Sequence, residues 1–192
     1  MAQIILWRRL DLPGHEIAGL EALDEGWRLS GTTIFAYPHG PTILDCVVVC
    51  DAAWQTKSAR IIGAIGDRGT DVSVSVDTER RWRLHGTECV SVAGSSDIDL
   101  GFSPYTNLLP VRRLELAVGD EAQVRAAWLP FPSLRFELLL QRYRRESEGT
   151  YRYESAGGFV RTLEVDGAGF VTSYPGLWQA EPAADSRLLR DN

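Results

Sequence analysis

The chain has 192 residues and a formal net charge of -6 at pH 7, with a pI near 5.1. This length suits one domain with a substantial core, and the acidic balance argues against nucleic-acid binding, because phosphates attract a basic surface. It also argues against general binding to anionic membranes. No apolar run approaches the roughly 18 residues that span a bilayer, and residues 1–16 lack the charge order of a secretory signal. The sequence therefore predicts a cytoplasmic protein without stable membrane insertion.

Short segments in which apolar and polar residues alternate recur along the chain, and turn signals separate them. In residues 69–84, for example, Val72, Val74 and Val76 share one face, with serines on the other. The stretches DEGW, YPHGP and VDGAG, which divide such segments, are typical of turns. This spacing predicts an all-β protein with an antiparallel sheet that closes, rolls or stacks.

Residues 16–26 could form a helix or a strand. Ile17, Leu20 and Leu23 recur at helical spacing, but Gly19 interrupts them and no strong N-cap residue precedes them. We interpret this segment as a strand.

Two cysteines, Cys46 and Cys50, are four residues apart, and Cys89 is the third. On a strand, positions four apart share a face, so the first two are expected to point into one apolar layer as small hydrophobes. A metal site at that spacing would need further ligands nearby. We therefore predict no metal site and a reduced protein.

Residues 133–148 are the better helix candidate, since Ser133 can act as N-cap and Glu137 lies near the first turn. The same residues also alternate with a period of two. As a strand, they place Phe136, Leu138 and Leu140 on one side and Arg135, Glu137 and Leu139 on the other. We again favour the strand.

A weak internal repeat supports that choice. A shift of 89 residues aligns 41–78 with 130–167 without a gap. The matches lie at turns and strand ends: Pro41 with Pro130, Trp54 with Tyr143, Ser58 with Ser147, and Gly69 with Gly158. By this alignment, residues 42–63 form two strands around Trp54. The sequence predicts a single β domain over 1–180 with a duplicated unit, followed by a loosely ordered tail over 181–192.

The densest polar stretch is SSDIDLGFSPYTNLLPVRRLEL, residues 95–116. If DIDL is a strand, Asp97 and Asp99 share a face, with side chains roughly 7 Å apart. Paired carboxylates suit general acid-base chemistry. They are also consistent with the solvent side of a strand whose Ile98 and Leu100 face the core.

Pro104 and Pro110 disfavour helical conformation in the residues before them, so the segment between them is predicted to be an irregular, rigid crossing. Ser103, Tyr105 and Asn107 lie on or beside it and could bond to the backbone or to a ligand.

Arg112 and Arg113 are expected to point to opposite sides of an extended segment, so that only one can face a cavity. The N-terminal WRR, residues 7–9, poses the same choice for its successive arginines, Arg8 and Arg9, and it also carries Trp7. Tryptophan offers a large surface for a sugar ring or a lipid chain, and six tryptophans leave room for a minority that line a cavity. The chain has no nucleophile elbow, phosphate loop or HExxH motif, so we predict no catalytic residue and no cofactor.

Four stretches, LWRRLDLPGHE (6–16), GWRLSG (26–31), VVVCDAAWQTKSA (47–59) and DLGFSPYTNLLPVRRL (99–114), resemble a bacterial family described as "putative glycolipid-binding". The resemblance implies a spiral β-roll or half-open barrel, built from a duplicated unit and comparable to the lipoprotein-carrier folds that hold acyl chains. It implies no catalytic residue.

Three hypotheses follow. The first is a non-catalytic binder of a glycolipid or similar amphipathic molecule. Its candidate contacts are Trp7, Arg9, Asp97, Asp99, Ser103, Tyr105, Asn107, Arg112 and Arg113. The second is a hydrolase or isomerase of a small carbohydrate or lipid that uses Asp97 and Asp99. The third is a protein-interaction module that has an apolar patch and no cavity.

Overall fold

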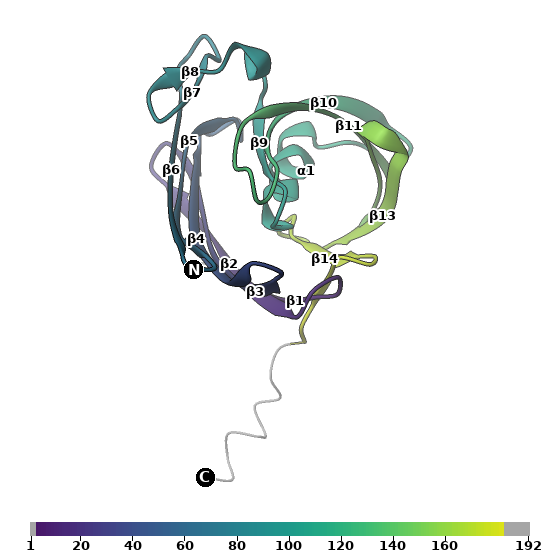
Figure 1. Cartoon of the computed structure of the whole chain (residues 1–192). Helices are drawn as coiled ribbons and strands as arrows, with labels where there is room; N and C mark the ends of the chain where they lie inside the picture. Colours follow the sequence, from purple (N-terminus) through teal and green to yellow (C-terminus); the bar gives the residue numbers. More distant parts are fainter. Residues whose placement is uncertain (1–2, 183–192) are drawn as a thin grey trace.

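The computed structural model describes residues 3–182, and these form one open sheet that winds as a spiral (Figure 1). Within them the sheet has fifteen strands, in the order β8-β7-β6-β5-β4-β3-β2-β1-β15-β14-β13-β12-β11-β10-β9. Neighbouring strands are antiparallel except β9 and β10, which are parallel. The sheet has two edges, β8 and β9, and does not close into a barrel. The predicted all-β roll is confirmed.

The first half of the chain is a meander that starts in the middle of the sheet and runs to one edge. Its strands are β1 (Gln3–Arg9), β2 (Gly14–Leu23), β3 (Gly26–Tyr37), β4 (Gly40–Cys50), β5 (Thr56–Ile65), β6 (Arg68–Val76), β7 (Trp82–Leu84) and β8 (Thr87–Glu88).

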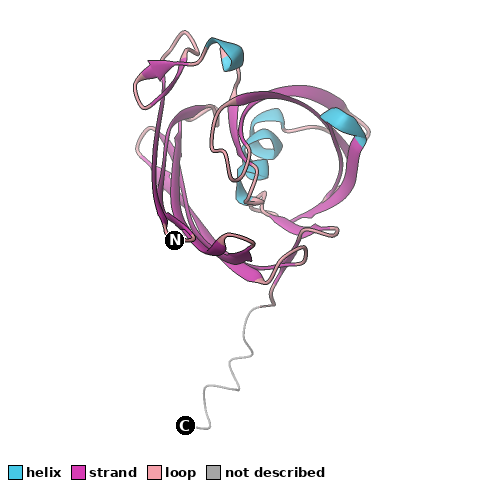
Figure 2. Ribbon diagram, viewed as in Figure 1, coloured by secondary structure: helices cyan, strands magenta, loops and turns pink. Residues whose placement is uncertain are grey.

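The second half begins at the opposite edge and returns to the middle. A 3-10 turn, η1 (Val90–Val92), leads to β9 (Asp97–Leu100), then η2 (Tyr105–Asn107) and the helix α1 (Leu108–Leu114). The remaining elements are β10 (Glu121–Leu129), β11 (Glu137–Ser147), β12 (Thr150–Ser155), η3 (Ala156–Gly158), β13 (Phe159–Val165), β14 (Val171–Tyr174) and β15 (Trp178–Ala180). Strand β15 pairs with β1, and the curl formed by β10–β13 encloses α1 (Figure 2).

Both ambiguous segments are strands, β2 and β11, as predicted. Residues 42–63 form β4 and β5 around a turn that contains Trp54. Cys46 and Cys50 are buried in the core, which confirms their shared inward face. On β11 the inward residues are Gln141 and Tyr143, while the side that carries Leu138 and Leu140 is exposed.

The prediction of an irregular crossing between Pro104 and Pro110 is wrong, because the chain there is helical. Pro110 is the third residue of α1, and in the first turn of a helix its missing N–H has no intrahelical acceptor to lose. Leu108, Leu109 and Val111 are buried, so their burial in the core stabilises the helix. Arg112 and Arg113 are consequently successive helical residues and do not point to opposite sides of an extended segment.

The predicted repeat stays a prediction. Segment 41–78 holds β4, β5 and β6, and segment 130–167 holds β11, β12 and β13, so each contains three consecutive antiparallel strands. The predicted tail over 181–192 falls, from residue 183 onward, outside the described residues.

Candidate functional site

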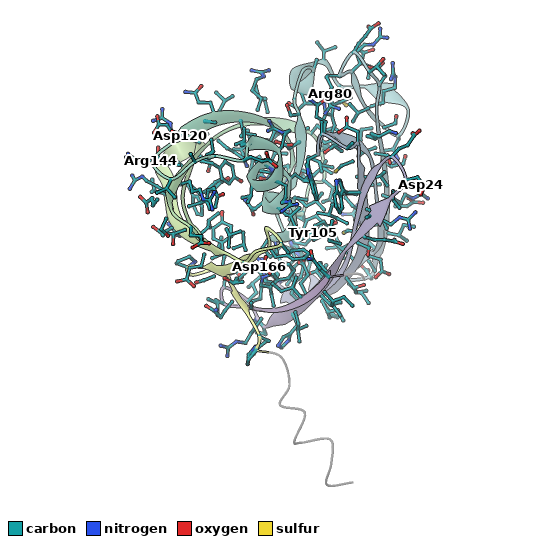
Figure 3. All side chains as sticks on the ribbon, turned by 180° about the vertical axis from the view of Figure 1, so that it is seen from behind. Asp24, Arg80, Tyr105, Asp120, Arg144 and Asp166 are labelled. Atoms are coloured by element: carbon teal, nitrogen blue, oxygen red, sulfur yellow. The ribbon has the colours of Figure 1, made fainter. Side chains whose placement is uncertain are left out.

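A cavity of about 380 Å³ lies inside the curl of the second half, within the size range of small-molecule sites. In Figure 3 this curl is on the same side of the molecule as Asp120 and Arg144. Its walls are mainly apolar and aromatic: Leu100, Gly101, Trp128, Leu139, Ala156, Phe159, Tyr174, Leu177 and Trp178. Five lining residues are polar: Asp99, Ser103, Asn107, Tyr153 and Ser155.

Asp99 projects from β9 into this cavity, where Gln141 of β11 positions it. Gln141 Nε2 donates hydrogen bonds to Asp99 Oδ2 at 2.5 Å and to the Tyr153 hydroxyl at 3.0 Å. These two bonds use both amide hydrogens of Gln141. Burial raises the pKa of Asp99 to about 6, although the bond from Gln141 lowers it. The carboxyl group is therefore mostly ionised at pH 7.

Ser103 and Asn107 are two further polar residues of the lining, and each bonds to a buried side chain behind it. Asn107 Nδ2 donates to the Tyr143 hydroxyl at 2.8 Å. Ser103 Oγ donates to Oε1 of Glu16, a buried carboxyl on β2. Burial raises the pKa of Glu16 to about 8, so this group is mostly protonated at neutral pH.

Three predicted contacts, Asp99, Ser103 and Asn107, thus meet in one cavity, while two others are core residues. Trp7 is completely buried, and its indole N–H donates to the Val171 carbonyl at 2.6 Å. Tyr105, near the centre of Figure 3, is 1% exposed. Neither side chain lines the cavity in this structure.

Asp97 forms an ion pair with Arg113 and, unlike Asp99, does not line the cavity. The guanidinium binds both carboxylate oxygens, at 3.0 and 2.5 Å, and the Asp97 side chain is 2% exposed. This pair attaches β9 to α1. The two aspartates share a face of β9, but only Asp99 reaches the cavity, so they do not form a paired catalytic site.

The two remaining arginines lie outside the cavity. Arg9 binds Asp11, and its guanidinium is 4.3 Å from the Phe35 ring centre and 4.9 Å from that of Trp178, a wall residue. Arg112 is 5.1 Å from the Trp54 ring and lines a separate polar hollow.

Sequence reasoning missed Glu16, Gln141 and Tyr153. A signal for the first was present, since Glu16 alternates with Ala18 and Leu20 on the inward face of β2. A charged residue on the apolar face of a strand marks a buried polar site. Gln141 likewise alternates with Tyr143 on the inward face of β11, a face that was not identified as inward.

Residues 3–182 contain no group of three or more His, Cys, Asp or Glu side chains gathered as metal ligands would be. They also contain no helix with the length and apolarity needed to cross a membrane.

The outer face of β1–β5 exposes a set of aliphatic side chains. Its members are Ile4, Leu6, Ile17, Ile34, Ile43, Val47 and Ile62. Register places two pairs of them opposite one another, Leu6 with Ile17 and Ile34 with Ile43. The molecule thus has the apolar patch of the interaction hypothesis together with the cavity that this hypothesis excluded.

The fold and the cavity define an all-β spiral roll that encloses a largely apolar space with a polar side. The profile of the family described as "Putative glycolipid-binding" matches residues 4–180. The chain belongs to this family.

Two solved structures are similar. A DUF1089 family protein from Pseudomonas aeruginosa is 30% identical, with a TM-score of 0.76 over 85% of this chain and 91% of that one. A beta-barrel-like protein of the DUF1849 domain of unknown function, from Brucella abortus, is 9% identical, with a TM-score of 0.53 over 94% of both chains. The second likeness concerns the fold alone. No curated protein matches the chain.

Proposed function

We propose that this protein binds an amphipathic ligand of the glycolipid type in the cavity of the second half, without catalysis. The observation that carries the proposal is the composition of the cavity. Aromatic and aliphatic walls, including Phe159 and Trp178, adjoin a polar side formed by Asp99, Tyr153 and Asn107. Each 100 Å² of apolar ligand surface buried against such walls contributes about 2.5 kcal/mol. The polar side chains orient the head group.

The positions of the two aspartates favour binding over catalysis. A hydrolase or isomerase that used both carboxylates would need them in one cleft. Arg113 holds Asp97 in a closed ion pair outside the cavity, which leaves Asp99 without a second carboxylate to act as its acid or base partner.

Alkyl glucosides with six, eight and ten carbons in the tail test the proposal. Trp128 and Trp178 line the cavity, so occupancy is expected to change tryptophan fluorescence. Affinity should rise with tail length by about 0.8 kcal/mol for each added methylene that the cavity can bury. Native mass spectrometry of the protein purified from its own host should show a bound amphipathic species.

The matched variants are Ala156→Trp and Ala52→Trp. Ala156 is exposed and lines the cavity, so a tryptophan there should obstruct it and weaken glucoside binding at least about tenfold. Ala52 is also exposed but lies in the turn between β4 and β5, and its variant should bind as the parent does. A mass spectrum of apo protein together with no glucoside binding would refute the proposal.

A further inference from the structure

Asp97 and Asp99 are two residues apart on β9, yet among residues 3–182 only Asp97 has a cationic partner. Arg113 binds both oxygens of Asp97. Asp99 receives a hydrogen bond from Gln141 on Oδ2 alone, and no donor in residues 3–182 reaches Oδ1. Oδ1 is not fully enclosed by protein atoms, so a ligand in the cavity can reach it. The protein completes the environment of Asp97 and leaves one oxygen of Asp99 open.

The cavity lining supplies no positive charge to neutralise Asp99. Over the part of the chain that the structure describes, Asp99 is the single charged residue of the lining. Arg9 and Arg161 lie 4.9 and 4.4 Å from the rings of Trp178 and Phe159, but neither lines the cavity. A carboxylate held away from bulk water without a counter-ion is unfavourable. A cation carried by the ligand would relieve that cost, and a phosphate or carboxylate on the ligand would increase it.

Aromatic rings surround the same space. Tyr153, Phe159 and Tyr174 form a triad in which each ring centre lies 6.0 to 6.2 Å from the other two. All three residues line the cavity with Asp99. The π-systems of such rings attract ammonium groups. A carboxylate and an aromatic triad together have the chemistry that recognises a protonated amine.

We propose that the head group bound in this cavity carries a protonated amine, which pairs with Oδ1 of Asp99. This inference rests on the proposed function and narrows the ligand to amine-bearing amphipathic molecules. An amino sugar attached to a lipid and a simple alkyl amine share this chemistry. The test separates the two sources.

Four octyl probes at pH 7 provide the test: octyl glucoside, its 2-amino-2-deoxy analogue, the N-acetyl derivative of that analogue, and octylamine. The first two differ at one position of the sugar. The parent protein should bind the amino glucoside at least about tenfold more tightly than the glucoside or the N-acetyl derivative, because an ammonium forms an ion pair with the Asp99 carboxylate where a hydroxyl or an amide offers only an uncharged donor.

The variants are Asp99→Asn and, as a control for the change in net charge, Asp120→Asn. Asparagine keeps the shape of Asp99 and its acceptor for Gln141 but removes the charge, so the preference for the amine should fall to within about twofold. Asp120 is exposed on the outside of the curl (Figure 3), and its variant should keep the preference. Tight octylamine binding would show that an alkyl amine suffices. Octylamine binding weaker than that of the amino glucoside would show that the sugar contributes.

Equal affinity of the parent for the glucoside and the amino glucoside would overturn the inference and leave the proposed function intact. A preference that persists in Asp99→Asn would also overturn it. The comparison among probes needs only the parent protein, so it decides the question even if a variant fails to fold. Failure of all four probes to bind would count against the proposed function itself.

Discussion

Glu16 places a carboxyl group in the core, 1% exposed and hydrogen-bonded to Ser103. Burial raises its pKa from 4.5 to about 8, although the Ser103 and Thr33 hydroxyls and Arg9 lower it. Between these two pH values, the folded protein holds a proton that the unfolded chain releases. The stability that this proton contributes is therefore fully present below about pH 4.5 and is lost as the pH rises through about 8.

The variant Glu16→Gln is expected to remove this dependence, because the amide stays neutral and can still accept the bond from Ser103. Relative to the variant, the parent should lose up to about 1.4 kcal/mol of unfolding free energy per pH unit inside the window. Urea denaturation of both proteins from pH 5 to pH 9 measures the difference. Asp97 and Asp99, whose pKa values burial also raises, are present in both proteins and cancel. A gap between the two stability curves that does not change with pH would contradict the prediction.

At the scale of elements, strands were easier to predict than the helix. The two-period alternation of β2 and β11 is a local property, and it identified both as strands despite their competing helical signals. Helix α1 is short and begins with Leu-Leu-Pro, so its own sequence favours an extended backbone conformation. Burial of Leu108 and Leu109 in the core outweighs that local preference.

The close approach of β5 to β4 at Gly63 yields a prediction for a single element. A Cβ atom there would lie 2.0 Å from the Ile43 carbonyl oxygen, with φ at +155°. The opposing atom belongs to the backbone and cannot rotate away, so Gly63→Ala should cost at least about 2 kcal/mol of unfolding free energy. Gly69, on neighbouring β6, has no atom within 4 Å of the added methyl. Gly69→Ala should change stability by less than about 0.5 kcal/mol. Denaturation midpoints at constant m-value test the pair, and equal losses would contradict the steric argument.

At the scale of the whole molecule, the two halves join at more than one place. Strands β1 and β15 pair in the middle of the sheet. At the other end of the spiral, Ser96 accepts from the Thr56 N–H and donates to the Arg125 carbonyl. The Arg80 guanidinium adds bonds to the carbonyls of Thr56, Ser95 and Ser96. These links join the segment that precedes β9 to β5 of the first half and to β10 of the second half.

We therefore expect residues 3–182 to unfold as one cooperative unit, with equal calorimetric and van't Hoff enthalpies. Arg80→Ala removes the donors for three carbonyls and should cost about 2–4 kcal/mol. Arg60→Ala, which breaks only an exposed pair with Asp71, should cost less than about 1 kcal/mol. Two separate transitions in the parent protein would show that the halves are independent domains.

The all-β class, most strand positions and the family could be predicted from the sequence, because alternation, turn residues and signature motifs are local. The candidate site could not. Asp99 and Gln141 are 42 residues apart, and Ser103 and Glu16 are 87 apart. Which of these polar groups meet depends on how far the sheet curls and on where α1 packs. The two aspartates of DIDL are equivalent in the sequence. In the folded protein Asp97 is neutralised by Arg113 of α1 and Asp99 faces the cavity, because the helix approaches β9 at one of these positions and not the other.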